Sequence, residues 1–165
     1  MVAISLPDGS VRNFDGPVTG AALAADIGPG LAKAALAVKV DGKLRDLMRE
    51  IEADATVEIV TRDHEDALEL LRHDAAHVFA EAVQELYPGT QITFGPAIED
   101  GFYYDFYREE PFTPDDFEAM EKRMQEIVDR DEEIIREIWD REAAIAHFRD
   151  AGESFKAEHI KTIPA

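Results

Sequence analysis

The sequence contains no cysteine. Disulfides, thiolate nucleophiles and cysteine metal ligands are therefore excluded within this chain, so a metal site would have to use histidine and carboxylate side chains. No apolar run approaches the ~20 residues that a membrane-spanning helix needs. The first residues, MVAISLPDGS, also lack the basic and apolar regions of a signal peptide. We therefore expect a cytoplasmic protein with no membrane partner.

Basic residues are scarce. The chain has 17 Lys and Arg against 36 Asp and Glu, which gives a formal net charge of -19. Residues 1–62 hold 9 acidic and 7 basic residues, so residues 63–165 carry nearly all of the acidic excess. Because phosphate contacts dominate most nucleic-acid affinity, this balance argues against broad, non-specific nucleic-acid binding by the second part. A local basic site is still compatible with it, and solvated helix faces account for most of the acidic charge.

Residues 1–62 have the pattern of a small mixed sheet. Alternating apolar residues on both sides of Pro7-Asp8-Gly9 predict a hairpin over residues 2–14, and a second strand pair is predicted around Asp41-Gly42. Between them, Thr19 can cap a helix, and LAKAAL makes another short helical stretch. An irregular stretch follows, and TVEIVT then predicts the last strand. The sequence therefore predicts a sheet that wraps one helix.

At Asp63 the pattern changes, and a second domain over residues 63–165 is predicted. A long helix ends at Pro88-Gly89, two extended segments flank Glu99-Asp100-Gly101, and Thr113-Pro114 opens another helix. The remaining segments are a predicted strand, EEIIREIWD, a helix, REAAIAHFRDAG, and a final extended segment, ESFKAEHIKTI. No closing element follows, so we expect a truncated second domain, with a ragged C-terminus as the alternative.

The long helix carries two histidines, His73 and His77, four residues apart. At about 100° per residue they lie opposite the predicted core stripe and share their side with small residues and Gln84. This shallow surface could accept a ligand, although the spacing also fits two exposed histidines on a polar face. The core stripe is formed by Leu71, Ala75, Val78, Phe79, Ala82 and Leu86, and the small residues beside the histidines are Ala76 and Ala80.

Two histidines at this spacing can bind a metal ion, but the sequence gives little support for a metal site. Position 74 is Asp, where the zinc-hydrolase helix motif has Glu, and no cysteine can complete the ligand set. The other histidines, His64, His147 and His159, are scattered along the chain. Neutral imidazoles can instead orient a hydroxyl group or a water molecule.

Aromatic residues and glycines follow the long helix. Gly95 and Gly101 allow close approach of the backbone to a ligand, and alternation sends Phe102 and Tyr104 to one face and Tyr103 to the other. One face would pack and the other could line a pocket. A phenol such as that of Tyr104 can serve either purpose. Lys156 is one of few cations in this part, and by default it is a surface lysine.

Several of these stretches, in this order, resemble the N-terminal region of the bacterial threonyl-tRNA synthetase family. LPDGS, DIGPGLAKA and VDGKLRDL are similar to its TGS domain, whereas LLRHDAAHVFAEAVQELYP, GPAIEDGFYYDF and GESFK are similar to the start of its editing domain. The resemblance covers the whole chain. It implies an α+β protein in which a ubiquitin-like β-grasp TGS domain (residues 1–62) precedes the N-terminal part of an α/β threonyl/alanyl-tRNA synthetase-type editing domain (residues 63–165).

The resemblance also implies a function. Members of this family are ATP-dependent ligases that attach threonine to tRNA(Thr), and their editing domain hydrolyses serine that was attached by error. A pocket that accepts threonine cannot strongly reject serine, because one methyl group is worth only ~1–3 kcal/mol. The implied partner is tRNA(Thr) carrying serine or threonine, and the implied homodimer forms through regions outside this chain. Zinc, ATP and Mg belong to the family's catalytic domain, so we expect no cofactor here.

By the same resemblance His73 and His77 match the family's HxxxH motif, Tyr104 matches its GFYYD tyrosine and Lys156 matches its ES(F/Y)K lysine. The histidines would orient the terminal ribose and a water molecule without a metal, whereas related alanyl editing proteins hold zinc there. Tyr104 would line the seryl pocket with Gly95 and Asp100 as further substrate-binding residues, and Lys156 would position the water or stabilise the oxyanion.

One departure from the family matters. A later family segment with Cys, Arg, Gly, Pro and His in close order has no counterpart here, so we expect an incomplete site with little or no hydrolysis by this chain alone. Two alternatives stay open. One is a TGS-bearing regulatory or binding module, but the HxxxH helix and the GFYYD stretch argue against it. The other is a free-standing trans-editing hydrolase that binds zinc through His73 and His77, but the absence of cysteine and of the later family segment argues against it.

Overall fold

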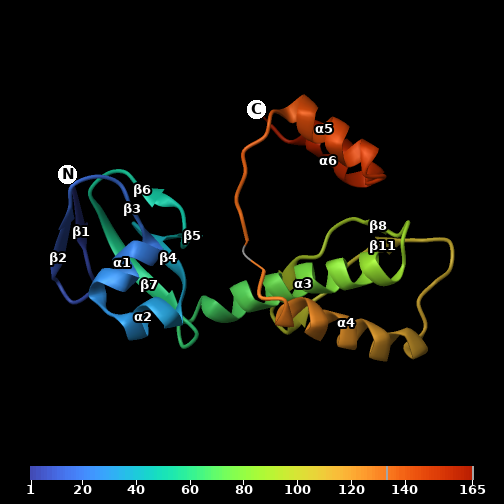
Figure 1. Ribbon diagram of the computed structural model, residues 1–165, viewed down its shortest axis with the longest axis horizontal. Coiled ribbons are helices and arrows are strands. Elements are labelled where there is room, and N and C mark those ends of the chain that lie inside the picture. Colours follow the sequence, from blue (N-terminus) through green and yellow to red (C-terminus); the bar gives the residue numbers. More distant parts are fainter. Residues whose placement is uncertain (133, 165) are drawn as a thin grey trace. The chain divides into compact units, whose positions relative to one another are not determined.

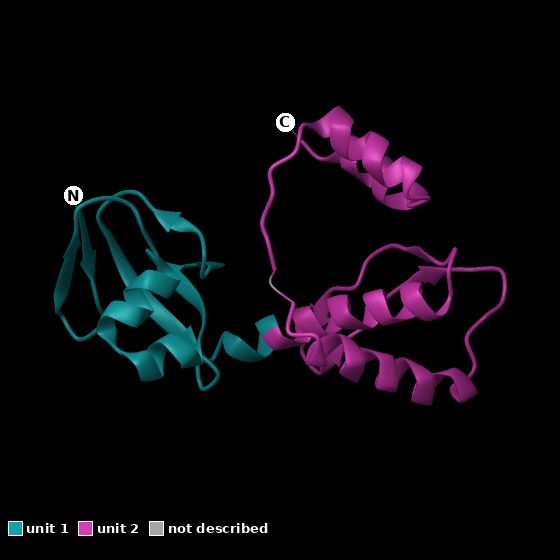
Figure 2. Ribbon diagram, viewed as in Figure 1, with its two compact units in different colours: residues 1–70 teal, residues 71–165 magenta. Residues whose placement is uncertain are grey.

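A computed structural model describes residues 1–132 and 134–164 of the chain (Figure 1). The chain divides into two compact units, residues 1–70 and residues 71–165 (Figure 2). This division falls after Leu70, whereas the sequence pattern changes at Asp63, and the domain boundary between residues 62 and 63 stays a prediction. None of the helices that the structure describes is long and apolar enough to cross a membrane.

The first unit is built on a five-stranded mixed sheet with the order β2-β1-β7-β4-β5. β1 pairs in parallel with β7, and the other neighbours are antiparallel. Both predicted hairpins are confirmed. A short pair of two-residue strands, β3 with β6, was not predicted, because two residues are too few to show an alternating pattern. The strands are β1 (Val2–Ser5), β2 (Val11–Phe14), β3 (Val18–Thr19), β4 (Ala35–Val40), β5 (Lys43–Asp46), β6 (Glu50–Ile51) and β7 (Ala55–Thr61).

Two short helices, α1 (Gly20–Ile27) and α2 (Pro29–Ala34), lie against one face of this sheet (Figure 1). The predicted cap of α1 is confirmed, since the hydroxyl oxygen of Thr19 accepts a hydrogen bond from the backbone N–H of Ala22 at 3.1 Å. Leu23 of α1 is fully buried in the core of the unit. The five-stranded sheet and the β3–β6 pair supply the other core residues, Val2, Ile4, Val18, Val38, Val40, Ile51 and Val57.

Residues 62–66, which follow β7, contact the sheet of the first unit before the long helix begins. The Nζ atom of Lys39 lies 2.7 Å from a carboxylate oxygen of Asp66, and the backbone N–H of Asp66 donates to Nδ1 of His64 at 3.1 Å. These contacts hold residues 62–66 in turns, so α3 (Ala67–Leu86) begins at Ala67 and not at Asp63 as predicted. Ala67 itself is buried with Ala37 and Val60.

In the second unit, short strand pairs and helices surround α3. The extended segments predicted on either side of Glu99-Asp100-Gly101 are confirmed as the antiparallel pair β9 and β10. A second antiparallel pair, β8 with β11, brackets them. The elements are β8 (Gln91–Ile92), β9 (Ala97–Ile98), β10 (Gly101–Phe102), β11 (Phe106–Tyr107), a 3-10 turn (Pro114–Asp116), α4 (Phe117–Asp129), α5 (Arg141–Asp150) and α6 (Ser154–Thr162).

Aromatic side chains join the strands to α3. The ring of Phe79 lies 5.3 Å from that of Phe106 and 6.1 Å from that of Phe102, and Tyr104 stacks on Phe106 at 4.9 Å. Tyr103, on the opposite face of the segment, is exposed. The predicted alternation is therefore confirmed, and it places Tyr104 on the packed face.

Two predicted elements are wrong. The described residues of EEIIREIWD, which are 132 and 134–140, form no strand, and Ile134 and Ile138 are 87% and 82% exposed. A strand needs a hydrogen-bonded neighbour, and these residues pair with no described strand; residue 133 lies outside the described residues. The predicted final extended segment is the helix α6, which packs on α5 and buries Ala157.

Candidate functional site

The two histidines of α3 touch each other. Their Nε2 atoms are 2.9 Å apart, and the ring centroids of His73 and His77 are 4.6 Å apart with an angle of 74° between the planes. At this distance one Nε2 must carry a proton and donate it to the other. A second proton would place two positive charges against each other, so the pair favours a state with at least one neutral imidazole.

The surroundings of His77 also favour its neutral form. Burial of part of the ring lowers its pKa, and the charges of His73 and Lys156 lower it further, against an opposing effect of Asp74. His77 can therefore accept a proton or a hydrogen bond near neutral pH. Lys156, which is far away in sequence, is thus one of the charges that act on His77.

His73 and His77 are themselves exposed, but the small residues beside them do not form the shallow open surface that the sequence predicts. Ala76 and Ala80 are 0% and 3% exposed, whereas Leu71, placed in the predicted core stripe, is 44% exposed. The reason is that α3 is packed on more than one side. Phe79 contacts the strand aromatics, and Gln84 donates a hydrogen bond from Nε2 to Oε1 of Glu153 at the start of α6.

Tyr104 is held in place by Gly95. A Cβ atom on Gly95 would lie 2.0 Å from Cδ2 of Tyr104, closer than any real contact. Gly95 is thus required for the position of the tyrosine ring. Burial raises the pKa of the Tyr104 phenol, and the negative charge of Glu153 raises it further, so the phenol keeps its proton and can donate a hydrogen bond.

Lys156 lies in the first turn of α6. Its Nζ atom is 3.9 Å from Oε2 of Glu153 and 5.3 Å from the centroid of the Phe148 ring. The start of α6 is also tied to β8, because the backbone N–H and the hydroxyl of Ser154 both donate to Oε1 of Gln91 at 3.0 Å. Lys156 therefore lies on an anchored helix end, with its side chain 33% exposed.

Glu153 is the residue that sequence reasoning missed. It contacts Gln84 and Lys156, and its charge acts on Tyr104. The sequence offered one indication of a polar partner near the histidines, because Gln84 follows His77 by seven residues and so lies on the same side of the helix. Nothing local singles out Glu153 among 36 acidic residues.

The predicted site residues thus divide into two groups. His73 and His77 contact each other, and the charge of Lys156 lowers the pKa of His77. Tyr104 is linked to Lys156 only through Glu153, and Gly95 supports its ring. Asp100 is exposed in the turn between β9 and β10, and none of its described contacts reaches the other five. The structure therefore does not bring Asp100 to this cluster.

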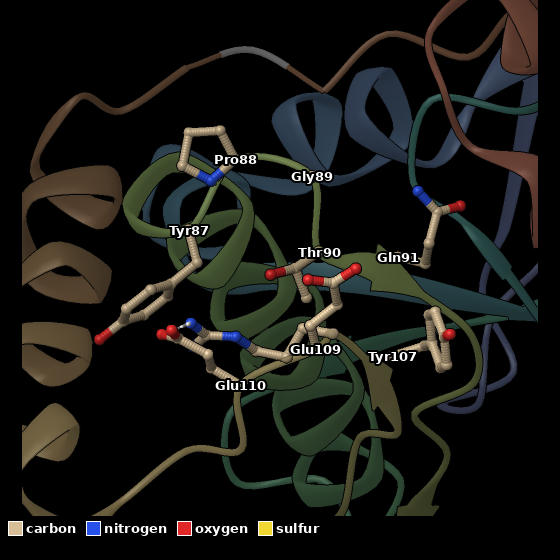
Figure 3. Close-up of a pocket in the computed structure, with 9 residues that line it drawn as sticks. Tyr87, Pro88, Gly89, Thr90, Gln91, Tyr107, Glu109 and Glu110 are labelled. Atoms are coloured by element: carbon tan, nitrogen blue, oxygen red, sulfur yellow. Dashed lines mark ion pairs between the residues drawn. The ribbon is translucent and has the colours of Figure 1, made fainter.

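Among the described residues of the second unit, two hollows bear on the choice of a ligand site. One, of about 330 Å³, adjoins Lys156 and is lined by Phe94, Phe155 and His159 among others. The other, of about 500 Å³, follows the end of α3, and the side chains of Tyr107 and Glu109 border it (Figure 3). No predicted site residue lines the second hollow, so the first is the better candidate for a ligand.

The larger hollow is also poorly suited to an anionic ligand. Its one lining cation is Arg108, whose guanidinium lies over the rings of Tyr87 at 4.5 Å and Phe112 at 4.7 Å. The same group lies 3.9 Å from a carboxylate oxygen of Glu110, which lines the hollow with Glu109.

A metal would need more ligands than the histidine pair supplies. Among residues 1–132 and 134–164, no group of three or more His, Asp or Glu side chains is placed to hold an ion. Catalytic zinc sites in proteins use three protein ligands. His73 and His77 would therefore need a third ligand from elsewhere.

Comparisons with known proteins agree with the motifs. Residues 2–61 match the TGS domain family. The whole chain aligns with 26% of the length of a threonine--tRNA ligase of Rhodospirillum rubrum, at 66% identity. It also aligns with 26% of the length of the enzyme of Paramagnetospirillum magneticum, at 65% identity. For the enzyme of Granulibacter bethesdensis the identity is 63%, over 99% of this chain and 26% of the relative. The chain spans about a quarter of the length of these curated relatives. Over its whole length the chain is therefore similar to the N-terminal region of the threonine--tRNA ligases, and it carries a TGS domain of β-grasp fold, followed by a mixed α/β region.

Proposed function

We propose that residues 63–165 form part of a proofreading site that hydrolyses serine from tRNA(Thr), within an enzyme that uses ATP to attach threonine to this tRNA. The observation that carries the proposal is the His73–His77 contact on α3, together with the contacts that run from Gln84 of the same helix through Glu153 to Lys156 on α6. Tyr104 joins the cluster through the charge of Glu153. A neutral base can activate water, a cation can stabilise the oxyanion of ester hydrolysis, and a protonated phenol can bind the amino acid.

The chemistry assigns a role to each group. In the hydrolysis a water oxygen attacks the ester carbonyl, the bond between the carbonyl carbon and the ribose oxygen breaks, and the ribose oxygen takes up the proton that the water loses, so that serine and a ribose hydroxyl are released. The water must lose a proton, and a neutral His77 paired with His73 can orient it and accept that proton. The developing negative charge on the carbonyl oxygen needs a donor, and the ammonium group of Lys156 can supply it.

Tyr104 suits the seryl side chain. Its ring is fixed between Gly95 and Phe106, and its phenol keeps a proton. A rigid, partly buried ring can limit the size of the amino acid, while the phenol can hydrogen-bond to its hydroxyl. A site that serine enters and the larger threonine does not would act as a second sieve after the synthetic site.

The first unit offers no catalytic candidate, and we assign its TGS domain a role in binding or orientation. For the enzyme as a whole we propose a cytoplasmic location, tRNA(Thr) as partner, and dimerisation through regions outside this chain. A regulatory or binding module built on the TGS domain is the competing function, and it is favoured by the family match of residues 2–61.

The test is deacylation of seryl-tRNA(Thr) by this chain and by a form extended through the next ~60 residues, the length that a small domain still needs. Each is assayed with and without His73→Ala. We expect hydrolysis by the extended form alone and its loss in His73→Ala. His147→Ala is the matched control, because His147 is an exposed histidine of α5 whose ring contacts Trp139 and Phe148. If the extended form leaves seryl-tRNA(Thr) intact, the proofreading proposal fails and the binding module becomes the better explanation.

A further inference from the structure

Glu153 is a buried carboxylate in a chain whose acidic residues mostly face solvent. It is 9% exposed, and no other charged residue in the described part of the chain is as buried. Burying a carboxylate without full compensation is costly, so such a group is retained where it does something specific. Its two oxygen atoms have different surroundings, and these indicate what it does.

One oxygen is bound and the other is directed at a cation. Oε1 accepts a hydrogen bond from Nε2 of Gln84. Oε2 is buried, has no hydrogen-bond partner among the described residues, and lies 3.9 Å from Nζ of Lys156. That distance is too long for a hydrogen bond but short enough for a strong attraction where solvent screening is weak.

Lys156 is restrained from two sides. Glu153 attracts its ammonium group, and the face of the Phe148 ring lies 5.3 Å from the same nitrogen. Glu153 in turn is restrained by Gln84, which lies on α3 two turns after His77. A continuous series of contacts thus leads from the histidine helix through Gln84 and Glu153 to Lys156.

We propose that Glu153 is a positioning residue that holds the ammonium group of Lys156 in range of His77, with Gln84 fixing the carboxylate. This inference deepens the proposed function, on which its catalytic consequence rests. Glu153 acts through Lys156 and does not touch the reacting atoms. Without the carboxylate, the long lysine side chain has the Phe148 ring as its remaining described partner and spreads over several rotamers.

The alternative is that Glu153 only joins α3 to α6 through its hydrogen bond with Gln84, and this alternative predicts a different result. Glu153→Gln keeps the size of the side chain, and its amide oxygen can still accept the hydrogen bond from Gln84. It removes only the negative charge that faces Lys156. The substitution therefore separates a charge that positions the lysine from a hydrogen bond that joins two helices.

The first experiment uses this chain and needs no activity. The pKa of His77 is measured by NMR in the wild type, Lys156→Met, Glu153→Gln and the double variant. Lys156→Met is expected to raise the pKa of His77, because the lysine charge lowers it. In the Glu153→Gln background this rise should be at most half as large. The other charges that act on His77 are those of His73 and Asp74, which are the same in all four chains.

The chain offers a matched control. Glu158 and Lys161 form another ion pair three residues apart on α6, and both are more exposed than Glu153. Glu158→Gln should leave the effect of Lys156→Met unchanged. The proposal is overturned if the rise in the pKa of His77 is the same with and without Glu153, or if Glu158→Gln reduces it as much.

A second experiment measures the catalytic consequence in the extended form. Glu153→Gln should lower kcat for seryl-tRNA(Thr) deacylation about 10- to 100-fold, the effect expected of a misplaced catalytic group, with KM changed less than kcat. An unchanged kcat would overturn the catalytic role. If the extended wild type does not hydrolyse at all, the proofreading function fails by itself, and the NMR titration still decides whether Glu153 positions Lys156.

Discussion

Gly95→Ala tests how firmly the ring of Tyr104 is held. The added Cβ would lie 2.0 Å from Cδ2, 2.4 Å from Cε2 and 2.7 Å from Cγ of Tyr104. Gly95 is not among the glycines with positive φ, so alanine suits its backbone. The predicted effect is therefore crowding of the ring and not backbone strain.

The ring has little room to move away. It stacks on Phe106 at 4.9 Å, and Phe106 meets Phe79 at 5.3 Å and Phe112 at 5.7 Å, both edge-on. Overpacking of such a cluster costs about 1–3 kcal/mol. We expect Gly95→Ala to lower the free energy of unfolding of the second unit by this amount and to shift the NMR signals of the Tyr104 ring.

Urea unfolding measures the stability change. Trp139, the single tryptophan, lies in the second unit against His147 and supplies a fluorescence signal. With a slope of about 2 kcal/mol per M urea, a loss of about 2 kcal/mol lowers the midpoint by roughly 1 M. Gly16→Ala is the control, because a Cβ there meets nothing within 4 Å. An unchanged midpoint and unshifted Tyr104 signals in Gly95→Ala would refute the packing of Tyr104 on Gly95.

Three further predictions concern stability. Gly20→Ala would bring a Cβ to 2.4 Å from Cγ1 of Val38, so the first unit should lose about 1–3 kcal/mol in thermal or urea unfolding, and an unaffected first unit would contradict this close approach. Asp140 caps α5 by accepting from two backbone N–H groups, so Asp140→Ala should cost about 1 kcal/mol, and urea unfolding with no loss would show that the cap contributes nothing. Arg130 and Arg123 lower the pKa of Glu85 from 4.5 to about 2, so its contribution to the free energy of unfolding is complete above about pH 4.5 and is lost as the pH falls toward 2. Urea unfolding at several pH values should show a smaller acid loss in Glu85→Gln, and identical pH profiles would refute the assignment.

The parts of the fold that were predicted correctly depend on short-range signals. The turn between β4 and β5 needs positive φ, and Asp41 and Gly42 adopt 49° and 76° there. The cap of α1 depends on Thr19 and a backbone group three residues later. Such features are complete within a few residues, so the sequence alone specifies them.

The parts that were predicted wrongly depend on distant residues. The segment ESFKAEHIKTI was predicted to be extended, yet its start is held by Gln91 through Ser154 and by Gln84 through Glu153, 63 and 69 residues away. Similarly, the stripe predicted on α3 assumed one packed side, whereas contacts reach this helix from the strands and from α6. Neither set of contacts leaves a periodic pattern in the local sequence.

The candidate site divides in the same way. His73, His77, Tyr104 and Lys156 came from motifs that resemble one family, because each motif contains an uncommon residue at a fixed spacing. The supporting role of Gly95 and the place of Glu153 in the cluster are visible only in the three-dimensional structure. Gly95 acts through the ring of Tyr104, and Glu153 acts through the ammonium group of Lys156.

The charges of the second unit bear on how it would meet a tRNA. Arg123 and Arg130 are paired with Glu85, and Arg108 lies over the rings of Tyr87 and Phe112, so these cations stabilise the fold. With 10 basic against 27 acidic residues, the part of the chain over residues 63–165 as a whole repels a phosphate backbone. Under the proposed function it would therefore receive only the 3′ end of a tRNA that is anchored by other parts of the enzyme. Lys156, held within the cluster, would then act on one ester and contribute little to overall tRNA affinity, so Lys156→Met should lower kcat for deacylation while tRNA binding stays nearly unchanged.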